Sequence, residues 1–389
     1  MLTPKNLSSE SPHLNFYREK KIAPVRQLGK ISDICAYRSE LYRQLGIHSL
    51  TIKGADILEV AFGTGQNSLC LAVHLPNSLS LVDPNPTGVE FARDLYGAVK
   101  IKHTIPKIQE SRLEDFEPTS KFDIVICENW LGNSKYDREL FSRLMRFGKK
   151  DSFLITTAIS PIGILPNLLR RIVSYRIAHD CSESEISSKL VDLWSPHLKT
   201  MTSMTRSHSD WVIDNLINPA YRGILVTPVD IAQQASYDFN IHATYPKFAQ
   251  DFTWFKQLPR DPTEELSWFE NEYYENCHTF LHYSLPHVRG ESATNRNLDR
   301  DSKRLFSAVA KWEVAAVCDR SHLWQSITKL LESIASQIKQ IYPRDLSDMV
   351  RKSIDHTIKP NLDLNAIKSC DSFGNWFGRE TIYLSMVKR

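Results

Sequence analysis

The chain has 389 residues, of which 42% are hydrophobic and 24% charged, the composition of an ordinary folded protein with a sizeable core. Its 48 Lys and Arg residues stand against 45 Asp and Glu residues, a balance that argues against a protein that coats DNA or RNA. No run approaches the roughly 18 apolar residues of a membrane-spanning helix, and no secretory signal is expected. Seven scattered cysteines without a CxxC pair exclude zinc-ribbon, thioredoxin and iron–sulfur sites, so we expect a cytoplasmic protein.

The first 160 residues alternate short apolar runs with segments of helical length. Residues 1–30 are polar and patternless and predict a tail or a loosely held arm, whereas residues 31–46 have helical spacing. Strand-like apolar runs then follow at 55–62, 79–83, 122–129 and 152–159, with helical segments at 66–75, 87–97 and 136–148. This alternation predicts βαβ units in a parallel sheet buried on both faces. A further strand is expected between 98 and 116, where the sequence marks it poorly.

After Gly163 the pattern changes to helices and loops. Residues 164–200 predict helices and residues 201–234 predict loops. Residues 235–246 alternate enough to form a late strand, and the segment from 262 to about 370 is mostly helical. The alternation of residues 381–388 is typical of a strand that returns to a sheet edge.

The end of the first predicted strand carries an acid followed by glycines, in the run Glu59-Val60-Ala61-Phe62-Gly63-Thr64-Gly65. Glycine is required where the backbone turns sharply from a strand into a helix and approaches a ligand. Asp83 ends the second predicted strand, and neighbouring strand ends of an open parallel sheet face the same crevice. Asp83 is therefore placed to accept hydrogen bonds from both hydroxyls of a ribose.

Two kinds of nucleotide cofactor use this arrangement. A dinucleotide site has a third glycine, where this chain has Ser68, and the carboxylate of Glu59 would repel a pyrophosphate. The same carboxylate would favour a cationic aminoacyl sulfonium. The motif therefore favours S-adenosylmethionine, and a nicotinamide-dependent oxidoreductase on a related fold stays as the alternative.

These residues resemble the first motif of the class I S-adenosylmethionine-dependent methyltransferase family, an acid followed by Gly-x-Gly-x-Gly, with Ala61 in place of the first glycine. The resemblance covers about residues 55–160. The stretches 36–46 and 203–219 are similar to a bacterial subgroup with a long C-terminal extension. The resemblance implies a Rossmann-like sheet with S-adenosylmethionine as cofactor and S-adenosylhomocysteine as product.

In that family the glycines pass under the methionine part of the cofactor, with the acid of the motif near its amino group. The resemblance implies a ribose contact at Asp83 and adenine contacts at Pro84 and near Arg112. The full set of implied cofactor-binding residues is Glu59, Ala61, Phe62, Gly63, Gly65, Asn67, Asp83, Pro84, Arg112, Leu113 and Glu128.

Methyl transfer is an in-line displacement that needs alignment first, and a base only when the acceptor carries a proton. His208 is a candidate base because residues 206–211 gather basic, acidic and aromatic groups in a predicted loop. Glu128 is the second candidate, at the position where the family faces the sulfonium. The alternatives are an ordinary loop histidine and a surface acid at a strand end. Candidate substrate contacts are Asn129, Trp130, Tyr175, Arg206, Asp210 and Trp211.

Other polar residues have simpler interpretations. Arg170, Arg171 and Arg176 are expected on the solvent-exposed face of an amphipathic helix, or alternatively against an anionic substrate. His278 and His282 are four residues apart without a third ligand at a recognisable spacing, so we expect packing and no metal site.

We therefore expect a doubly wound α/β fold of class I methyltransferase type in three parts. These are an N-terminal arm with cap helices (1–54), a Rossmann-like core with an inserted lid at about 164–234 (55–260), and a mostly helical C-terminal region (261–389). The predicted function is methyl transfer to an oxygen or nitrogen of a small or medium-sized acceptor, by a monomer or homodimer. A non-catalytic methyltransferase-like scaffold, which binds a partner through its C-terminal helices, is the remaining alternative.

Overall fold

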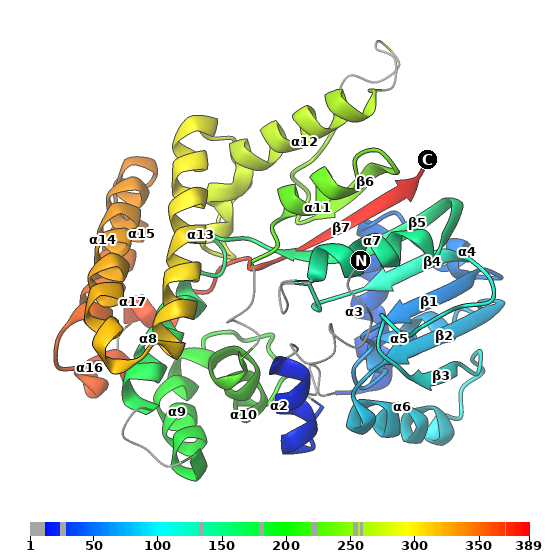
Figure 1. The fold of residues 1–389 in the computed structure, drawn as a ribbon, viewed down its shortest axis with the longest axis horizontal. Coiled ribbons are helices and arrows are strands. Elements are labelled where there is room, and N and C mark those ends of the chain that lie inside the picture. Colours follow the sequence, from blue (N-terminus) through cyan, green and yellow to red (C-terminus); the bar gives the residue numbers. More distant parts are fainter. Residues whose placement is uncertain are drawn as a thin grey trace.

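A seven-stranded sheet fills the right-hand side of the described part of the molecule in the view of Figure 1, and helices of the insertions lie to its left. The computed structural model describes residues 12–23, 29–131, 136–178, 183–219, 225–251, 256, 260–369 and 371–389. The strands are β1 (Asp56–Val60), β2 (Ser78–Asp83), β3 (Lys107–Glu110), β4 (Phe122–Cys127), β5 (Gly148–Ile159), β6 (Phe239–Tyr245) and β7 (Thr381–Lys388). Their order is β3-β2-β1-β4-β5-β7-β6. Strands β1 to β5 run parallel, and β7 runs antiparallel to both β5 and β6.

Apolar side chains of these strands alternate between two cores, one on each face of the sheet. Ile57 of β1 lies in the core shared with α3 (Ile31–Gln44), α5 (Gln66–Ala72) and α6 (Pro86–Ala98), whereas Leu58 lies in the core that includes α7 (Asp137–Arg146). The short helix α4 (Ser49–Ile52) precedes β1. Burial on both faces explains why the strands are nearly continuous apolar runs. The predicted doubly wound α/β fold is confirmed, and the poorly marked strand is β3.

Helices fill the connection between β5 and β6. They are α8 (Leu165–Ala178), α9 (Glu183–Leu198), α10 (His208–Val212), a π-helical turn (Ile213–Ile217) and α11 (Pro228–Ala235). Two arginines of α8 are buried, contrary to the expectation of an exposed face: Arg170 donates to Trp376 O (2.9 Å), and Arg171 pairs with Glu313 (2.6 Å). The reason is tertiary, because helices far along the chain cover the face of α8 that its own sequence would leave to solvent.

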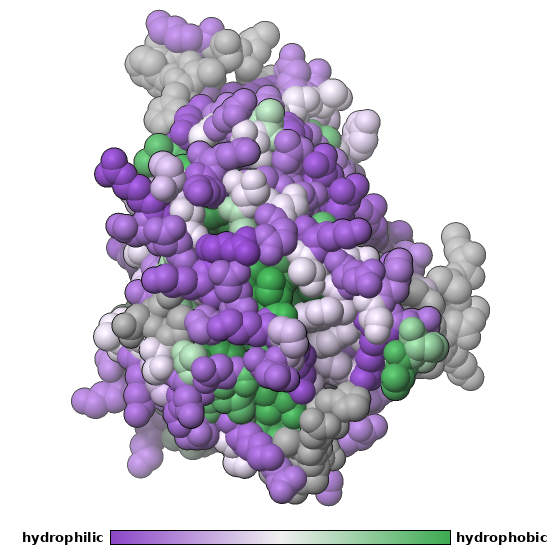
Figure 2. Space-filling view, turned by 90° about the vertical axis from the view of Figure 1, so that its left-hand side faces the viewer, coloured by the Kyte–Doolittle hydropathy of each residue, from purple (hydrophilic) through white to green (hydrophobic). Residues whose placement is uncertain are grey.

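The mostly helical region lies between β6 and β7. It comprises α12 (Pro262–Asn276), a 3₁₀ turn (Cys277–Leu281), α13 (Ser292–Val314), α14 (Val317–Ile341), α15 (Asp345–Ile358), α16 (Leu364–Lys368) and α17 (Asp371–Gly374). Since β7 then enters the sheet between β5 and β6, these helices are an insertion rather than an extension. Hydrophilic side chains cover most of the face of the molecule seen in Figure 2, and the hydrophobic areas on it are separated from one another by hydrophilic residues.

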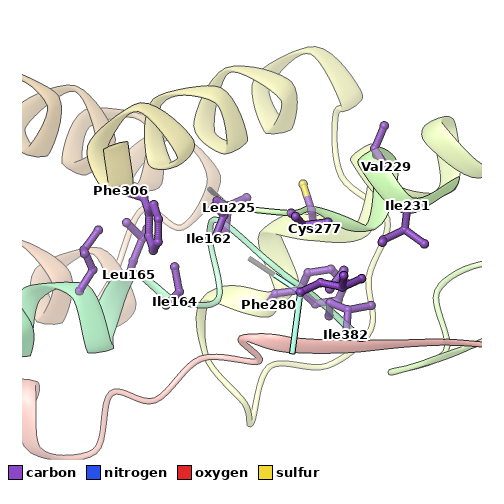
Figure 3. Packing of buried hydrophobic residues seen from close by; sticks show 14 of the residues in the cluster. Ile162, Ile164, Leu165, Leu225, Val229, Ile231, Cys277, Phe280, Phe306 and Ile382 are labelled. Atoms are coloured by element: carbon purple, nitrogen blue, oxygen red, sulfur yellow. The ribbon is translucent and has the colours of Figure 1, made fainter. Parts of the chain in front are cut away.

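The inserted helices share one core with the sheet. Phe306 of α13 reaches down toward Ile164 and Leu165 at the start of α8, and Phe280 lies beside Ile382 of β7 (Figure 3). The insertion therefore packs directly behind the carboxyl ends of the parallel strands. None of the helices in the described ranges has the length and apolarity needed to span a membrane.

An N-terminal helix, α2 (Pro12–Lys20), lies across the open side of the sheet edge at which β1 and β2 end (Figure 1). It falls within the residues expected to form a patternless arm. Only Leu14 of this helix is buried, so its sequence carries little amphipathic signal, and polar contacts with other elements hold it in place.

Candidate functional site

A cavity of about 330 Å³ lies where the carboxyl ends of β1, β2, β4 and β5 meet the beginning of β7. Its walls include Glu59, Asp83 and Glu128 from the strand ends, Trp211 from α10 and Phe306 from α13. In an open α/β sheet this edge is where ligands bind, because the strand order reverses there. The fold therefore brings the glycine loop and the inserted helices around one space.

The glycine loop has the backbone that its sequence predicts. Gly63 and Gly65 have φ values of 63° and 75°, which favour glycine, and Ala61 also has a positive φ of 59°. A Cβ on Gly65 would lie 2.9 Å from Cβ of Ala92, so glycine is needed there for α6 to pack on the loop. A Cβ on Gly63 would meet nothing within 4 Å. The loop thus presents bare backbone to the cavity at Gly63.

Asp83, at the end of β2, holds this loop from the side. Its Oδ2 accepts the N–H of Gly63 (2.9 Å) and its Oδ1 accepts the N–H of Asn85 (2.8 Å). Burial raises the pKa of Asp83 to about 6, and the two backbone N–H groups partly offset that rise. Asn85 in turn caps α6, where its Oδ1 accepts the N–H of Thr87. The carboxylate is therefore fixed at the cavity wall, with acceptor capacity left for a diol.

Glu59 is buried in β1, and its Oε2 has no hydrogen-bond partner within the described ranges. Burial, with the negative charge of Glu128 nearby, raises the pKa of Glu59 to about 8. An unpartnered buried carboxylate oxygen is costly unless a ligand supplies a donor or a positive charge. This oxygen, beside the bare backbone of Gly63, fits the amino group of S-adenosylmethionine and does not fit a phosphate.

Glu128 and Asn129 follow β4. Arg38 of α3 donates to Oε1 of Glu128 (2.5 Å), and the hydroxyl of Tyr42 lies 3.3 Å from the same oxygen. Asn129 has a φ of 53°, and its N–H donates to Oγ1 of Thr157 (2.6 Å). This buried ion pair orients Glu128 at the centre of the sheet edge, and helix α3 supplies its cation.

A smaller hollow of about 30 Å³ adjoins the main cavity. Arg112, Leu113 and Glu114 line it, and Pro84 and Trp130 line both spaces. The hollow lies at the β2 and β3 side, where the family resemblance implies the adenine. Of the residues predicted for that contact, Pro84 lines both spaces, whereas Arg112 and Leu113 line only the hollow next to the main cavity.

Helix α2 closes part of the cavity, and sequence reasoning missed it. The Tyr17 hydroxyl donates to Asp214 (2.6 Å) and accepts from Asn218 (2.6 Å), and Arg18 donates to Pro84 O (2.7 Å). His13 lines both spaces, and burial, together with Arg112, lowers its pKa to about 4. Residues 1–30 have no hydrophobic periodicity from which these contacts could be predicted.

The far end of the cavity is built from the inserted helices and the start of β7. Trp211 and Phe306 supply aromatic surface, and Arg206, which pairs with Asp214 (2.9 Å), also lines the cavity. Glu380, directly before β7, also lines this end. Phe306 and Glu380 were not predicted as site residues, because no motif or periodicity near them in the sequence indicates that α13 and β7 reach this edge of the sheet.

The predicted site residues fall into three groups. Those lining the main cavity are Glu59, Ala61, Phe62, Gly63, Asn67, Asp83, Pro84, Glu128, Asn129, Trp130, Arg206 and Trp211. Arg112 and Leu113 line the adjoining hollow. Gly65, Tyr175, His208 and Asp210 line neither space.

The residues outside the two spaces have structural contacts. Gly65 caps α5. Nδ1 of His208 lies 2.9 Å from Oγ of Ser195, and the hydroxyl of Tyr175 donates to Glu313 O (2.5 Å). The structure does not bring His208 to the cavity, so its role as a base stays a prediction without a geometric basis.

Residues 58–156 match the family model of a methyltransferase domain. Among solved structures, magnesium protoporphyrin IX methyltransferase from Synechocystis, with bound S-adenosylhomocysteine, is 14% identical, over 62% of this chain and 91% of that chain, with a TM-score of 0.37. The N-methyltransferase NodS from Bradyrhizobium japonicum is 16% identical, over 32% of this chain and 61% of that one, with a TM-score of 0.27. No curated protein matches the sequence.

Proposed function

We propose that this chain, whose residues 58–156 form an S-adenosylmethionine-dependent methyltransferase domain, transfers a methyl group to a nitrogen or oxygen of a small or medium-sized acceptor. One observation carries the proposal: the unpartnered carboxylate oxygen of Glu59 and the loop-holding carboxylate of Asp83 face one cavity. A cationic amino acid joined to a ribose has complementary groups for both. The cofactor, when bound, supplies a methyl group on a sulfonium.

The residues at the strand ends would hold the cofactor. Glu59 would accept hydrogen bonds from the amino group, and Asp83 would accept hydrogen bonds from the ribose hydroxyls. Pro84 and Leu113 would lie against the adenine. Glu128 would face the sulfonium with its charge balanced by Arg38. The walls made by α2, Trp211 and Phe306 would exclude water and align the acceptor, which is the main requirement of an in-line displacement.

The size of the cavity and the net charge of the chain support an acceptor of small or medium size. Its volume of about 330 Å³ is at the lower end of ligand pockets and must serve cofactor and acceptor together. A net charge of +3 is too small to give the strong positive electrostatic potential that attracts bulk nucleic acid. A cytoplasmic location, a monomer or homodimer, and three parts divided at about residues 54 and 260, with β7 of the third part inside the sheet of the second, belong to the same proposal.

Calorimetric titration with S-adenosylhomocysteine tests the proposal. Wild-type protein should bind it, and Asp83→Ala should weaken binding by about 100-fold or more, because two hydrogen bonds to a charged group are lost. Asp94→Ala, at an exposed position of α6, is the matched control and should bind like wild type. Asp83→Asn keeps the shape and one acceptor oxygen, so it separates lost charge from disturbed folding.

The alternatives predict different results. Binding of reduced nicotinamide dinucleotide without binding of S-adenosylhomocysteine would support an oxidoreductase and overturn the proposal. A folded wild-type protein that binds neither ligand would support a non-catalytic scaffold. Equal affinity of wild type and both Asp83 variants for S-adenosylhomocysteine would contradict the site as built here.

A further inference from the structure

Glu380 lies at the acceptor end of the cavity, away from the cofactor-binding strands. It directly precedes β7, and Thr381, its neighbour, pairs with Ile159 at the end of β5. In the strand order, β7 is two strands beyond β4, which at the usual strand spacing is about 10 Å. That is the side of the sheet edge opposite to Asp83 and the adenine hollow.

The backbone around Glu380 is tightly fixed. The N–H of Ser160 donates to Glu380 O (2.8 Å). A Cβ on Gly163 would lie 2.2 Å from Arg379 O, and a Cβ on Gly378 would lie 2.0 Å from Gly163 O. The turn after β5 and the approach to β7 therefore touch without room for side chains, and Glu380 is held rigidly against the cavity.

Glu380 differs from the other acidic residues of the cavity in how its charge is balanced. Glu128 has Arg38 as partner and Asp214 has Arg206, whereas no side chain in the described ranges donates to the carboxylate of Glu380. Arg170 is the cation that acts on it electrostatically, and Arg170 donates instead to Trp376 O and Phe373 O.

Desolvation raises the pKa of Glu380 above its ordinary range. A carboxyl with a raised pKa accepts a proton more readily than an ordinary surface carboxylate.

Apolar side chains form part of the cavity wall. Ile159, Ile164, Trp211 and Phe306 line the cavity together with Glu380, and Figure 3 shows Phe306 reaching toward Ile164 from above. An acceptor that fits here has an apolar body and one polar group directed at Glu380. A phenolate or carboxylate acceptor would be repelled by Glu380, because like charges at short range in a desolvated site are strongly unfavourable.

We propose that the acceptor is an amine with an apolar body, and that Glu380 binds its nitrogen and takes its proton. This inference rests on the proposed methyltransferase function. Glu380 first accepts one N–H proton from the bound ammonium, which frees the nitrogen lone pair. The lone pair then forms a bond to the methyl carbon as the carbon–sulfur bond breaks, and sulfur keeps that electron pair in the thioether product. The methylated amine leaves as a secondary ammonium, and the carboxylic acid of Glu380 releases its proton to water.

Ligand binding tests this without any need for turnover. The protein is first saturated with S-adenosylhomocysteine and then titrated with 2-phenylethylamine, 2-phenylethanol and 3-phenylpropionate, which share a ring and differ in charge. Wild-type protein should prefer the amine over both others by at least about tenfold. Glu380→Gln should remove that preference while it leaves the affinity for S-adenosylhomocysteine within about twofold of wild type.

The control is Glu90→Gln, which removes one carboxylate at an exposed position of α6 and should keep the wild-type preference. Equal or tighter binding of the acid, an unchanged preference in Glu380→Gln, or no binding of the amine at millimolar concentration would each overturn the inference. Failure of wild-type protein to bind S-adenosylhomocysteine would instead overturn the proposed function, so the two failures are distinguishable.

Discussion

Replacement of Glu59 by glutamine should stabilise the free protein and weaken cofactor binding. Since burial raises the pKa of Glu59 to about 8, the folded protein without ligand holds a proton on this group at pH 7. The pKa of this group is higher in the folded protein than in the unfolded chain, so the group lowers the free energy of unfolding as the pH rises from its ordinary pKa of 4.5 to about 8. At about 1.4 kcal/mol per pH unit, the cost at pH 7 is about 3 kcal/mol.

Cofactor binding should reverse this cost. A positively charged amino group next to Glu59 favours the carboxylate, so the proton leaves as the ligand binds. With a starting pKa of about 8, the group is about nine-tenths protonated at pH 7, and binding should release about 0.9 proton. Glu59→Gln cannot release this proton and cannot form the ion pair.

Two measurements check this prediction. Titration of S-adenosylhomocysteine at pH 7 in buffers of different ionisation enthalpy gives the number of protons released, and thermal unfolding gives the stability of the free protein. Wild type should release close to one proton, and Glu59→Gln none, with a higher melting temperature and weaker binding. Zero proton release by wild type, or the same release by both proteins, would refute the reasoning about Glu59.

Three further changes test other parts of the site. Gly63→Val should abolish the binding of S-adenosylhomocysteine, measured by calorimetry, because it places a branched side chain in the cavity at a φ of 63°. Retained affinity would contradict the proposed contact between the glycine loop and the cofactor. Ala61→Gly should raise the free energy of unfolding by about 1 kcal/mol, since Ala61 has a φ of 59°, and an unchanged melting temperature would argue against strain there. Tyr17→Phe removes the hydroxyl bound to Asp214 and Asn218, and should weaken cofactor affinity by about tenfold with little change in melting temperature. Wild-type affinity in Tyr17→Phe would show that α2 does not close over the ligand.

Local patterns in the sequence predict the strands and the cofactor end of the site well. Hydrophobic periodicity indicates the buried strands, and the acid–glycine motif with Asp83 indicates one crevice, because both signals depend on neighbouring residues. β3 has only four residues, none of them buried, so its sequence carries no such periodicity.

The acceptor end could not be predicted for a physical reason. Glu380 and Phe306 reach the cavity only because β7 enters the sheet between β5 and β6 and α13 packs behind the strand ends. Those placements follow from tertiary packing, which a short window of sequence does not contain. Arg170 is a second example of a placement that the local sequence does not predict. Its charged side chain predicts exposure, yet the segment inserted between β6 and β7 buries it completely.

The position of β7 between β5 and β6 has a consequence for how this protein is made. Ile159 of β5 must find its partner Thr381, which is 222 positions later in the chain. During synthesis on the ribosome, the edges of β5 and β6 that later pair with β7 stay unpaired until the helices between β6 and β7 have been produced. A chain interrupted before residue 381 would carry the whole glycine motif and still expose two open strand edges, which are sites for aggregation.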